Sequence, residues 1–320
     1  MKQRTLIIEE YEFTKQEYLR EVISRMVQDK DVDLSVRLKY YQVPITRKLL
    51  NSVVDTIKDI GKNREFFVEI ILETDQWKNI KHLYKVLNQY AVSVELLVSE
   101  KLKRSEVKKY TKKVLLEKLI LSCNNYSTFY QLYQYWKEVG LSIKLEGYRL
   151  SENEYFEFWE EWIHDSSAVW FLAFENLLSS RLIGKLVDCC EYSSCMGKYL
   201  YIDKDENVYF CEQKKEKSKM YSLKNGIPKY IFNTVYDRVL DAAVEKRSKC
   251  KETCSVFPLC RGGCPLDEQK MNCTQEYLKK VVHMDEFLGK ELINGFANIE
   301  NPCFRQFYLS LIAYGYNYAQ

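Results

Sequence analysis

The sequence predicts an α/β protein in which six strand–helix pairs precede a small cysteine-rich domain. Short runs rich in Val, Ile, Leu and Phe alternate with amphipathic stretches as far as Ile163. Nine of the 11 cysteines then fall between Cys189 and Cys273. With 46% apolar and 29% charged residues among 320, the composition is that of an ordinary globular protein with room for one large and one smaller domain. We therefore expect a first domain over residues 1–180 and a second over residues 181–320.

The predicted strands of the first domain are short runs of β-branched and large apolar residues. They cover residues 5–8, 33–41, 66–73, 92–98, 118–122 and 141–146. Helices are expected between and after them, over residues 15–28, 45–60, 79–89, 105–116, 128–139 and 152–163. Thr14 precedes the first helix, Ser151 and Glu154 form a capping-box pattern, and Gly140 is placed to end the fifth helix. Six consecutive units of this kind predict a parallel sheet covered by helices, either an open doubly wound sheet or a partial (β/α) barrel.

Charge and glycine content argue against several classes of function. A formal charge of +3, from 48 basic and 45 acidic residues, predicts neither nucleic acid nor a membrane as the partner. The 11 glycines form no G-x-G-x-x-G or P-loop pattern, so a dinucleotide or nucleoside triphosphate site of the usual type is not expected. Since the sequence has no apolar window of spanning length and no secretory signal pattern, we expect a cytoplasmic protein. In a reducing compartment, clustered cysteines indicate metal binding or catalysis rather than disulfides.

The cysteines of the second domain form two blocks. The first block contains Cys189, Cys190, Cys195 and Cys211, and the second contains Cys250, Cys254, Cys260, Cys264 and the nearby Cys273. Strands over residues 199–202 and 208–210, turning at residues 203–207, predict a hairpin that returns the last cysteine of the first block close to its neighbours. A cubane cluster needs four converging thiolates, so eight to nine cysteines suit two sites of four.

Both blocks resemble the SPASM domain of radical S-adenosylmethionine peptide maturases, most clearly over residues 203–211 and 259–265. The resemblance implies a partial (β/α)6 radical-SAM-like barrel followed by a small iron–sulfur (SPASM-like) domain. It also implies two [4Fe–4S] clusters. The ligands carried over by position are Cys189, Cys195, Cys211 and Cys264 for the first cluster, and Cys250, Cys254, Cys260 and Cys273 for the second. Cys190 is an alternative to its neighbour as a ligand.

The sequence departs from the family pattern in several places. Glu206 stands where the family usually has glycine in the hairpin turn, and the step from Cys250 to Cys254 is one residue longer than the commonest spacing. The radical-initiating motif, C-x3-C-x2-C after the first strand, is missing, because Cys123 is the only cysteine before Cys189. Residues 73–75 also lack the glycine-glycine-glutamate feature near the methionine moiety.

These losses predict a degenerate, pseudo-radical-SAM member with no catalytic and no S-adenosylmethionine-binding residues. The expected role is that of an accessory protein in ribosomal peptide maturation. Its expected partner is a genuine radical SAM maturase, the precursor peptide of that enzyme, or both.

Several alternatives stay open from the sequence. The cysteines suit structural zinc in a binding module, and an auxiliary cluster with a labile ligand position suits a stand-alone redox enzyme. The lysine-rich run over residues 101–113 fits an acidic leader peptide or a solvated helix face, and that over residues 214–219 fits a counter-charge for clusters or a solvated loop. Cys123 and Cys303 are expected to be thiols without a metal role. Residues 276–292 predict a closing helix, followed by a turn at Pro302 and an aromatic tail.

Overall fold

The computed structural model divides into two compact units that interleave along the chain. It describes residues 2–9, 16–26, 32–40, 46–60, 66–73, 83–89, 92–98, 102–148, 150–183, 199–212, 215–231, 234–253, 266, 275–293 and 299–313. Unit 1 contains the first four strands with their helices, together with the hairpin region and the long helix that follows it. Unit 2 contains the next two strands and the remaining helices. The domain boundary expected near residue 181 stays a prediction.

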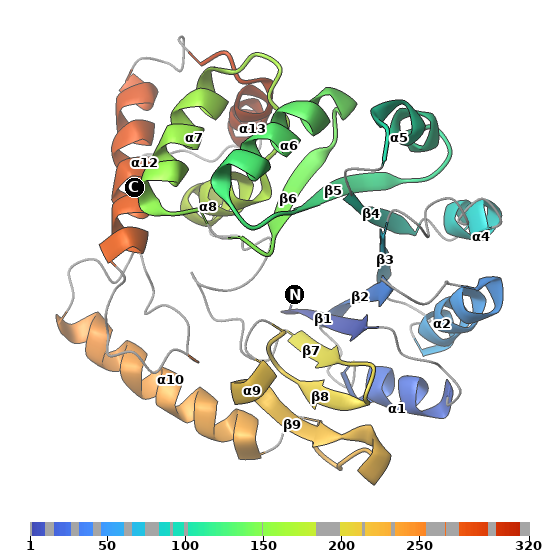
Figure 1. Ribbon diagram of the computed structural model, residues 1–320. Coiled ribbons are helices and arrows are strands. Elements are labelled where there is room, and N and C mark those ends of the chain that lie inside the picture. The colour runs from blue at the N-terminus through green and yellow to red at the C-terminus, as the bar shows by residue number, and fades with distance from the viewer. Residues whose placement is uncertain are drawn as a thin grey trace. The chain divides into compact units, whose positions relative to one another are not determined.

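Unit 1 contains seven neighbouring strands of the nine-stranded sheet, in the order β4-β3-β2-β1-β7-β8-β9. The strands are β1 (Lys2–Glu9), β2 (Val32–Tyr40), β3 (Phe66–Glu73), β4 (Ser93–Val98), β7 (Tyr199–Ile202), β8 (Asn207–Tyr209) and β9 (Lys219–Ser222). Strands β1 to β4 run parallel, β7 continues this direction beside β1, and β8 and β9 pair antiparallel. The predicted hairpin is therefore confirmed, and it extends the sheet of the strand–helix units (Figure 1).

Helices α1 (Gln16–Met26), α2 (Arg47–Ile60), α4 (Tyr84–Gln89) and α5 (Arg104–Thr111) alternate with these strands. They lie along one side of them in Figure 1. One face of the sheet is aliphatic. Its fully buried residues are Leu6, Ile8, Leu34, Val36 and Leu38. Burying one such side chain stabilises the fold by about 1.5–3 kcal/mol. The predicted helix over residues 105–116 is too long, because the chain turns after α5 and enters the next strand at Leu116.

The turn of the β7–β8 hairpin is organised by one carboxylate. The Asp203 side chain accepts hydrogen bonds from the backbone N–H groups of Asp205 (2.9 Å) and Asn207 (2.8 Å) and from the Tyr209 hydroxyl (2.8 Å). The Glu206 N–H donates to the Asp203 carbonyl at 3.0 Å, which closes the turn. Glu206 itself has φ +66°, so it occupies the left-handed position that glycine favours in a three-residue hairpin loop. Its place in the turn explains why a glycine is usual there.

Unit 2 is a layer of helices rich in aromatic residues, packed around two parallel strands. The strands are β5 (Leu116–Ser122) and β6 (Ser142–Glu146). The helices are α6 (Tyr126–Trp136), the 3-10 helix η2 (Lys137–Val139), α7 (Glu152–His164), α8 (Leu172–Ile183), α12 (Gln275–Ile293) and α13 (Pro302–Ala313). Ring centroids lie 5.0 Å apart for Phe129 and Phe158 and 4.9 Å apart for Trp159 and Phe174, both in edge-to-face geometry. Such pairs add about 0.5–1.5 kcal/mol each beyond the area they bury.

Helix ends in unit 2 follow the sequence signals closely. Ser151 and Glu154 form the predicted capping box of α7, and Gly140, with φ +80°, ends η2. The turn expected at Pro302 is instead the start of α13. Proline is tolerated at the first helical position, and Asn301 caps the helix by accepting the Phe304 N–H at 3.0 Å. No helix among the described residues is long and apolar enough to cross a membrane.

Candidate functional site

The inner face of the unit 1 sheet is polar and yet hidden from solvent. Thr5, Ser35, Lys39, Ser93 and Glu95 are between 2% and 7% exposed, and all occupy alternate positions opposite the aliphatic face. Buried polar groups cost free energy unless they are paired, so polar side chains gathered on one buried face mark it as a candidate site. We call this surface the polar face.

Strand register brings the members of the polar face together. In the parallel pairing Thr5 lies opposite Ser35, and Glu9 lies opposite Lys39. The same register places Tyr201 of β7 opposite Ile7, so its ring lies on the same face as the Glu9 side chain. In parallel α/β sheets, ligands bind beyond the carboxyl ends of the strands. Glu9 and Lys39 stand at such ends.

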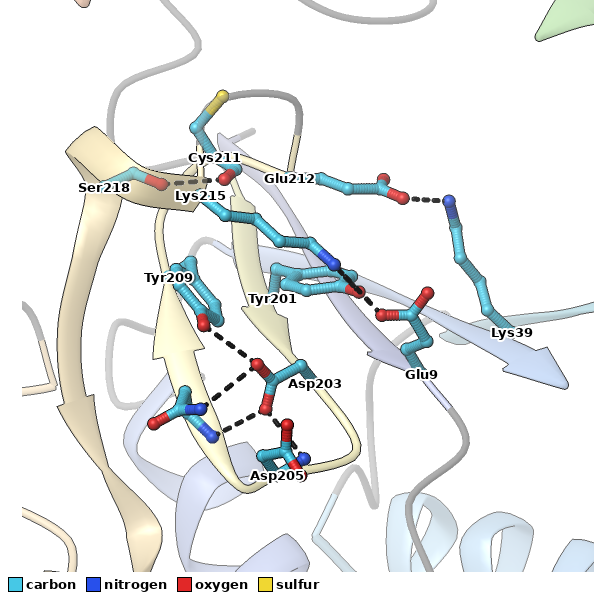
Figure 2. Close-up of polar contacts among 11 residues, drawn as sticks. Glu9, Lys39, Tyr201, Asp203, Asp205, Tyr209, Cys211, Glu212, Lys215 and Ser218 are labelled. Carbon is cyan, nitrogen blue, oxygen red and sulfur yellow. Dashed lines mark hydrogen bonds and ion pairs between the residues drawn. The ribbon is translucent and has the colours of Figure 1, made fainter. Parts of the chain in front are cut away.

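A lysine from outside the parallel strands is bound at the end of β1. Lys215, in the short helix α9 (Lys215–Ser218), donates from Nζ to the Tyr201 hydroxyl at 2.8 Å and pairs with a Glu9 carboxylate oxygen at 3.1 Å. The ammonium also lies 4.5 Å from the centroid of the Tyr201 ring. Figure 2 shows the three groups converging. The lysine of the 214–219 run is thus bound by a carboxylate and a tyrosine.

A second ion pair lies at the end of β2. Lys39, only 4% exposed, pairs with the half-buried carboxylate of Glu212 (Figure 2). A buried ammonium persists only with a partner of opposite charge, so Glu212 is what allows a lysine on this face. The two pairs have opposite polarity: β1 supplies a carboxylate and β2 supplies an ammonium.

Tyr209 and Tyr201 extend the site with aromatic surface. Their centroids are 5.8 Å apart, and both rings pack with Ile7. Burial raises the pKa of Tyr209, and its hydrogen bond to the Asp203 carboxylate raises the pKa further, so the phenol stays protonated at neutral pH. Its role there is that of a hydrogen-bond donor.

Of the eight predicted cluster ligands, one is placed with its side chain. Cys211 follows β8, is 7% exposed, and its carbonyl accepts a hydrogen bond from Ser218 Oγ at 2.7 Å. Its sulfur points away from the Tyr209 and Asp203 side chains (Figure 2). Cys250 lies in the last turns of α10 (Thr234–Thr253). The other predicted ligands, Cys189, Cys195, Cys254, Cys260, Cys264 and Cys273, lie outside the described residues, as does the alternative Cys190.

The described residues bring no three Cys, His, Asp or Glu side chains together as a metal site. The two tetrads therefore stay predictions. A buried thiol at the end of a hairpin is consistent with a ligand role for Cys211, since soft thiolates are the ligands that iron–sulfur clusters use. Cys123 and Cys303 lie in unit 2, and burial is the main cause that raises the pKa of each thiol.

The sequence directly after β1 lacks the cysteines of a C-x3-C-x2-C motif. A radical-initiating cluster needs three thiolates after the first strand, and the stretch from Glu9 to Gln16 contains no cysteine. The structure places a carboxylate bound to a lysine where that strand ends.

The polar face was missed from the sequence, although a signal for it exists. In β2, Leu34, Val36 and Leu38 alternate with Ser35 and Lys39. Alternation of this kind predicts a strand with one apolar and one polar face. The strand was predicted, and its second face was not interpreted.

Comparison with known proteins relates this architecture to one class of enzyme. No family model matches the sequence. The chain is 26% identical over 135 residues to the cysteine-type anaerobic sulfatase-maturating enzyme of Clostridium perfringens, and 28% identical over 125 residues to that of Clostridium novyi. These matches cover 42% and 38% of this chain and 36% and 33% of the relatives, so they span about a third of the length of the curated relatives.

Solved structures extend the likeness to nearly the whole chain. Native anSMEcpe with bound AdoMet superposes with a TM-score of 0.63 at 18% identity, covering 92% of this chain and 100% of that one. The same enzyme with AdoMet and the Cp18Cys peptide gives 0.64 at 17% identity, covering 93% and 100%. The chain has the fold of an anaerobic sulfatase-maturating enzyme. At this identity the likeness shows the fold alone.

Proposed function

We propose that this protein is an accessory iron–sulfur protein of peptide maturation that does not initiate radical chemistry itself. It binds a precursor peptide, a genuine radical SAM maturase, or both. The observation that carries this proposal is the fold of a sulfatase-maturating enzyme, with the cysteine blocks present and with no cysteine between the first strand and Cys123.

Two [4Fe–4S] clusters are part of the proposal. Cys189, Cys195, Cys211 and Cys264 would hold one, and Cys250, Cys254, Cys260 and Cys273 the other. When bound, such clusters supply a one-electron carrier and fix the loops that ligate them. The hydrogen bond from Ser218 to the Cys211 carbonyl holds the backbone of one ligand in place from the protein side.

The polar face is the proposed place of peptide contact. Beside its buried members, Glu9, Glu212 and Lys215 are 25%, 34% and 40% exposed, and they offer donors and acceptors near the carboxyl ends of β1 and β2, where ligands of parallel sheets bind. Among the structural relatives, anSMEcpe has been solved with a bound Cp18Cys peptide. A peptide here would meet these three charged groups, whereas the rings of Tyr201 and Tyr209 are buried and Tyr201 holds Lys215 in place.

Anaerobic reconstitution followed by iron and sulfide analysis tests the cluster part. We expect about eight iron atoms per chain, and loss of about four in Cys211→Ser. Cys123→Ser and Cys303→Ser are matched controls that should keep the full content. Zinc in place of iron, or iron for one cluster only, would overturn this part of the proposal.

Two further measurements test the role. The reconstituted chain alone should form no 5′-deoxyadenosine from S-adenosylmethionine and reductant, because it lacks the three thiolates of an initiating cluster. The chain should also co-purify with the maturase or the precursor peptide produced beside it. Release of 5′-deoxyadenosine by the isolated chain would contradict the accessory role, and so would turnover of a substrate without any partner. The second result would instead support a stand-alone redox enzyme.

A further inference from the structure

The chain around Cys211 is held by four contacts, two within residues 210–218 and two to the ends of β1 and β2. At its base, the Phe210 N–H donates to the Ser218 carbonyl at 3.2 Å, and Ser218 Oγ donates to the Cys211 carbonyl at 2.7 Å. Ser218 is fully buried, so water does not compete for these bonds. Further out, Glu212 pairs with Lys39 and Lys215 pairs with Glu9.

The two ion pairs are arranged so that only one docking of this segment satisfies both. Glu212 carries a negative charge toward β2, and Lys215 carries a positive charge toward β1. Glu9 and Lys39 are direct neighbours across the two strands, with opposite charges. A segment shifted toward the wrong strand would bring like charges together, which costs rather than contributes free energy.

The pairs also differ in burial, which decides their weight. Lys39 is 4% exposed, so its bond to Glu212 is screened little by solvent and is costly to break. The side chains of Lys215 and Glu9 are 40% and 25% exposed. An ion pair with this much solvent exposure contributes at most a small free energy by itself. The Tyr201 hydroxyl and ring also bind the Lys215 ammonium, and they orient it toward Glu9.

From these contacts we propose that Glu9 and Lys39 are positioning residues for the metal ligand Cys211. They act through Glu212 and Lys215 and hold the thiol in the place where its cluster assembles. The inference rests on the proposed function, since it requires a cluster at Cys211. It assigns to the ends of β1 and β2, where the sequence has no cysteine, the task of supporting Cys211, a cluster ligand that lies elsewhere in unit 1.

Release of iron to a chelator from the anaerobically reconstituted full chain tests the inference. Residues that support metal ligands from outside typically change metal affinity about 10–100-fold when removed. We expect Glu9→Gln and Lys39→Met each to release about half of the iron about tenfold faster or more than the wild type, with the other half unchanged. Asp59→Asn is the matched control, because it breaks the exposed Arg20–Asp59 ion pair of the same unit (3.3 Å) and should leave both phases unchanged.

A conservative variant separates positioning from general stability. Glu9→Asp keeps a carboxylate at the end of β1 and should hold the release rate within about threefold of the wild type, whereas Glu9→Gln should not. The reduction potential of one cluster should move in Glu9→Gln while that of the other stays, a result that uniform destabilisation would not produce. If Lys39→Met fails to fold, Glu9→Gln still decides the question, since Glu9 is partly exposed.

The outcomes distinguish the two proposals. If Cys211→Ser keeps the full iron content, there is no cluster at this thiol, and both the ligand assignment and this inference are overturned. If Cys211→Ser loses about four iron atoms but Glu9→Gln and Lys39→Met release iron as the wild type does, the clusters stand and the positioning role is refuted.

Discussion

Replacing Glu206 by glycine should stabilise the protein, although the change removes a whole side chain. Glu206 has φ +66°, and a left-handed backbone costs a residue with a Cβ about 1–2 kcal/mol. Its Oε2 atom is buried and accepts no hydrogen bond among the described residues, which adds about 1 kcal/mol of lost hydration. Glycine removes both the backbone penalty and the penalty of the buried Oε2 atom, but it costs about 0.5–1 kcal/mol because it makes the unfolded chain more flexible. The balance is a gain of about 1–2 kcal/mol in the free energy of unfolding.

Thermal and urea unfolding followed by far-UV circular dichroism measures this gain. A stabilisation of 1 kcal/mol corresponds to a rise of about 2–4 °C in the melting temperature for a chain of this size class. Lys204→Gly is the matched control in the same turn, because Lys204 is exposed and has no positive φ, so it should lower the free energy of unfolding by about 0.5–1 kcal/mol. If the two glycine variants shift stability in the same direction, the strain assigned to Glu206 is wrong.

Two further predictions concern unit 2. Asn301→Ala should lower the free energy of unfolding by about 1–3 kcal/mol, because it removes the cap of α13 and the hydrogen bond that Asn301 Nδ2 donates to the buried Trp162 carbonyl. Asn301→Asp keeps only the cap, so it should recover part of this loss when unfolding is measured by urea titration. The pKa of the Cys303 thiol is raised to about 11, mainly by burial and further by the Glu175 charge. At pH 8 the thiol should therefore stay protonated and react with iodoacetamide about 100-fold more slowly than an unperturbed thiol, and the rate should rise as the pH approaches 11. Peptide mapping by mass spectrometry measures the labelling, and rapid labelling of Cys303 in the folded chain at pH 8 would contradict the prediction.

The regular part of the fold was predictable because its signals are local. The strand expected over residues 33–41 is β2, and the hairpin expected to turn at residues 203–207 turns there. Both depend on residues that are neighbours in sequence, namely an alternating apolar run and a cluster of turn-forming side chains. Pro302 shows where such reasoning fails, because proline was interpreted as a turn although it also suits the first position of a helix.

The helices α8 and α10 were missed for a different reason. In α8 the apolar residues are not confined to one face. Helix α10 mixes lysines and a cysteine with its apolar residues and leaves Val244 more than half exposed, so neither helix shows one apolar stripe. Periodicity gives little warning of a helix of this kind. Its existence depends on tertiary contacts, such as that of Tyr236 with Phe210 at 5.5 Å between ring centroids.

The candidate site was predictable only in part. Cys211 was singled out from spacing and family resemblance; it is buried beside the hairpin, and its role as a ligand stays a prediction. Lys39 and Glu212 are 173 residues apart in the sequence, and the local sequence around either residue does not predict that they pair. Contacts of this kind follow from how β7 adds to the edge of β1, which is a property of the folded sheet.

The aromatic core described for unit 2 has a practical consequence for spectroscopy. Trp136, Trp159, Trp162 and Trp170 all belong to that unit, whereas the sequence of unit 1 supplies Trp77 alone. Indole emission will therefore follow chiefly the melting of one half of the molecule, while ellipticity averages over both. Comparing the fluorescence and circular dichroism signals during one denaturant titration will show whether units 1 and 2 unfold in a single transition or one after the other.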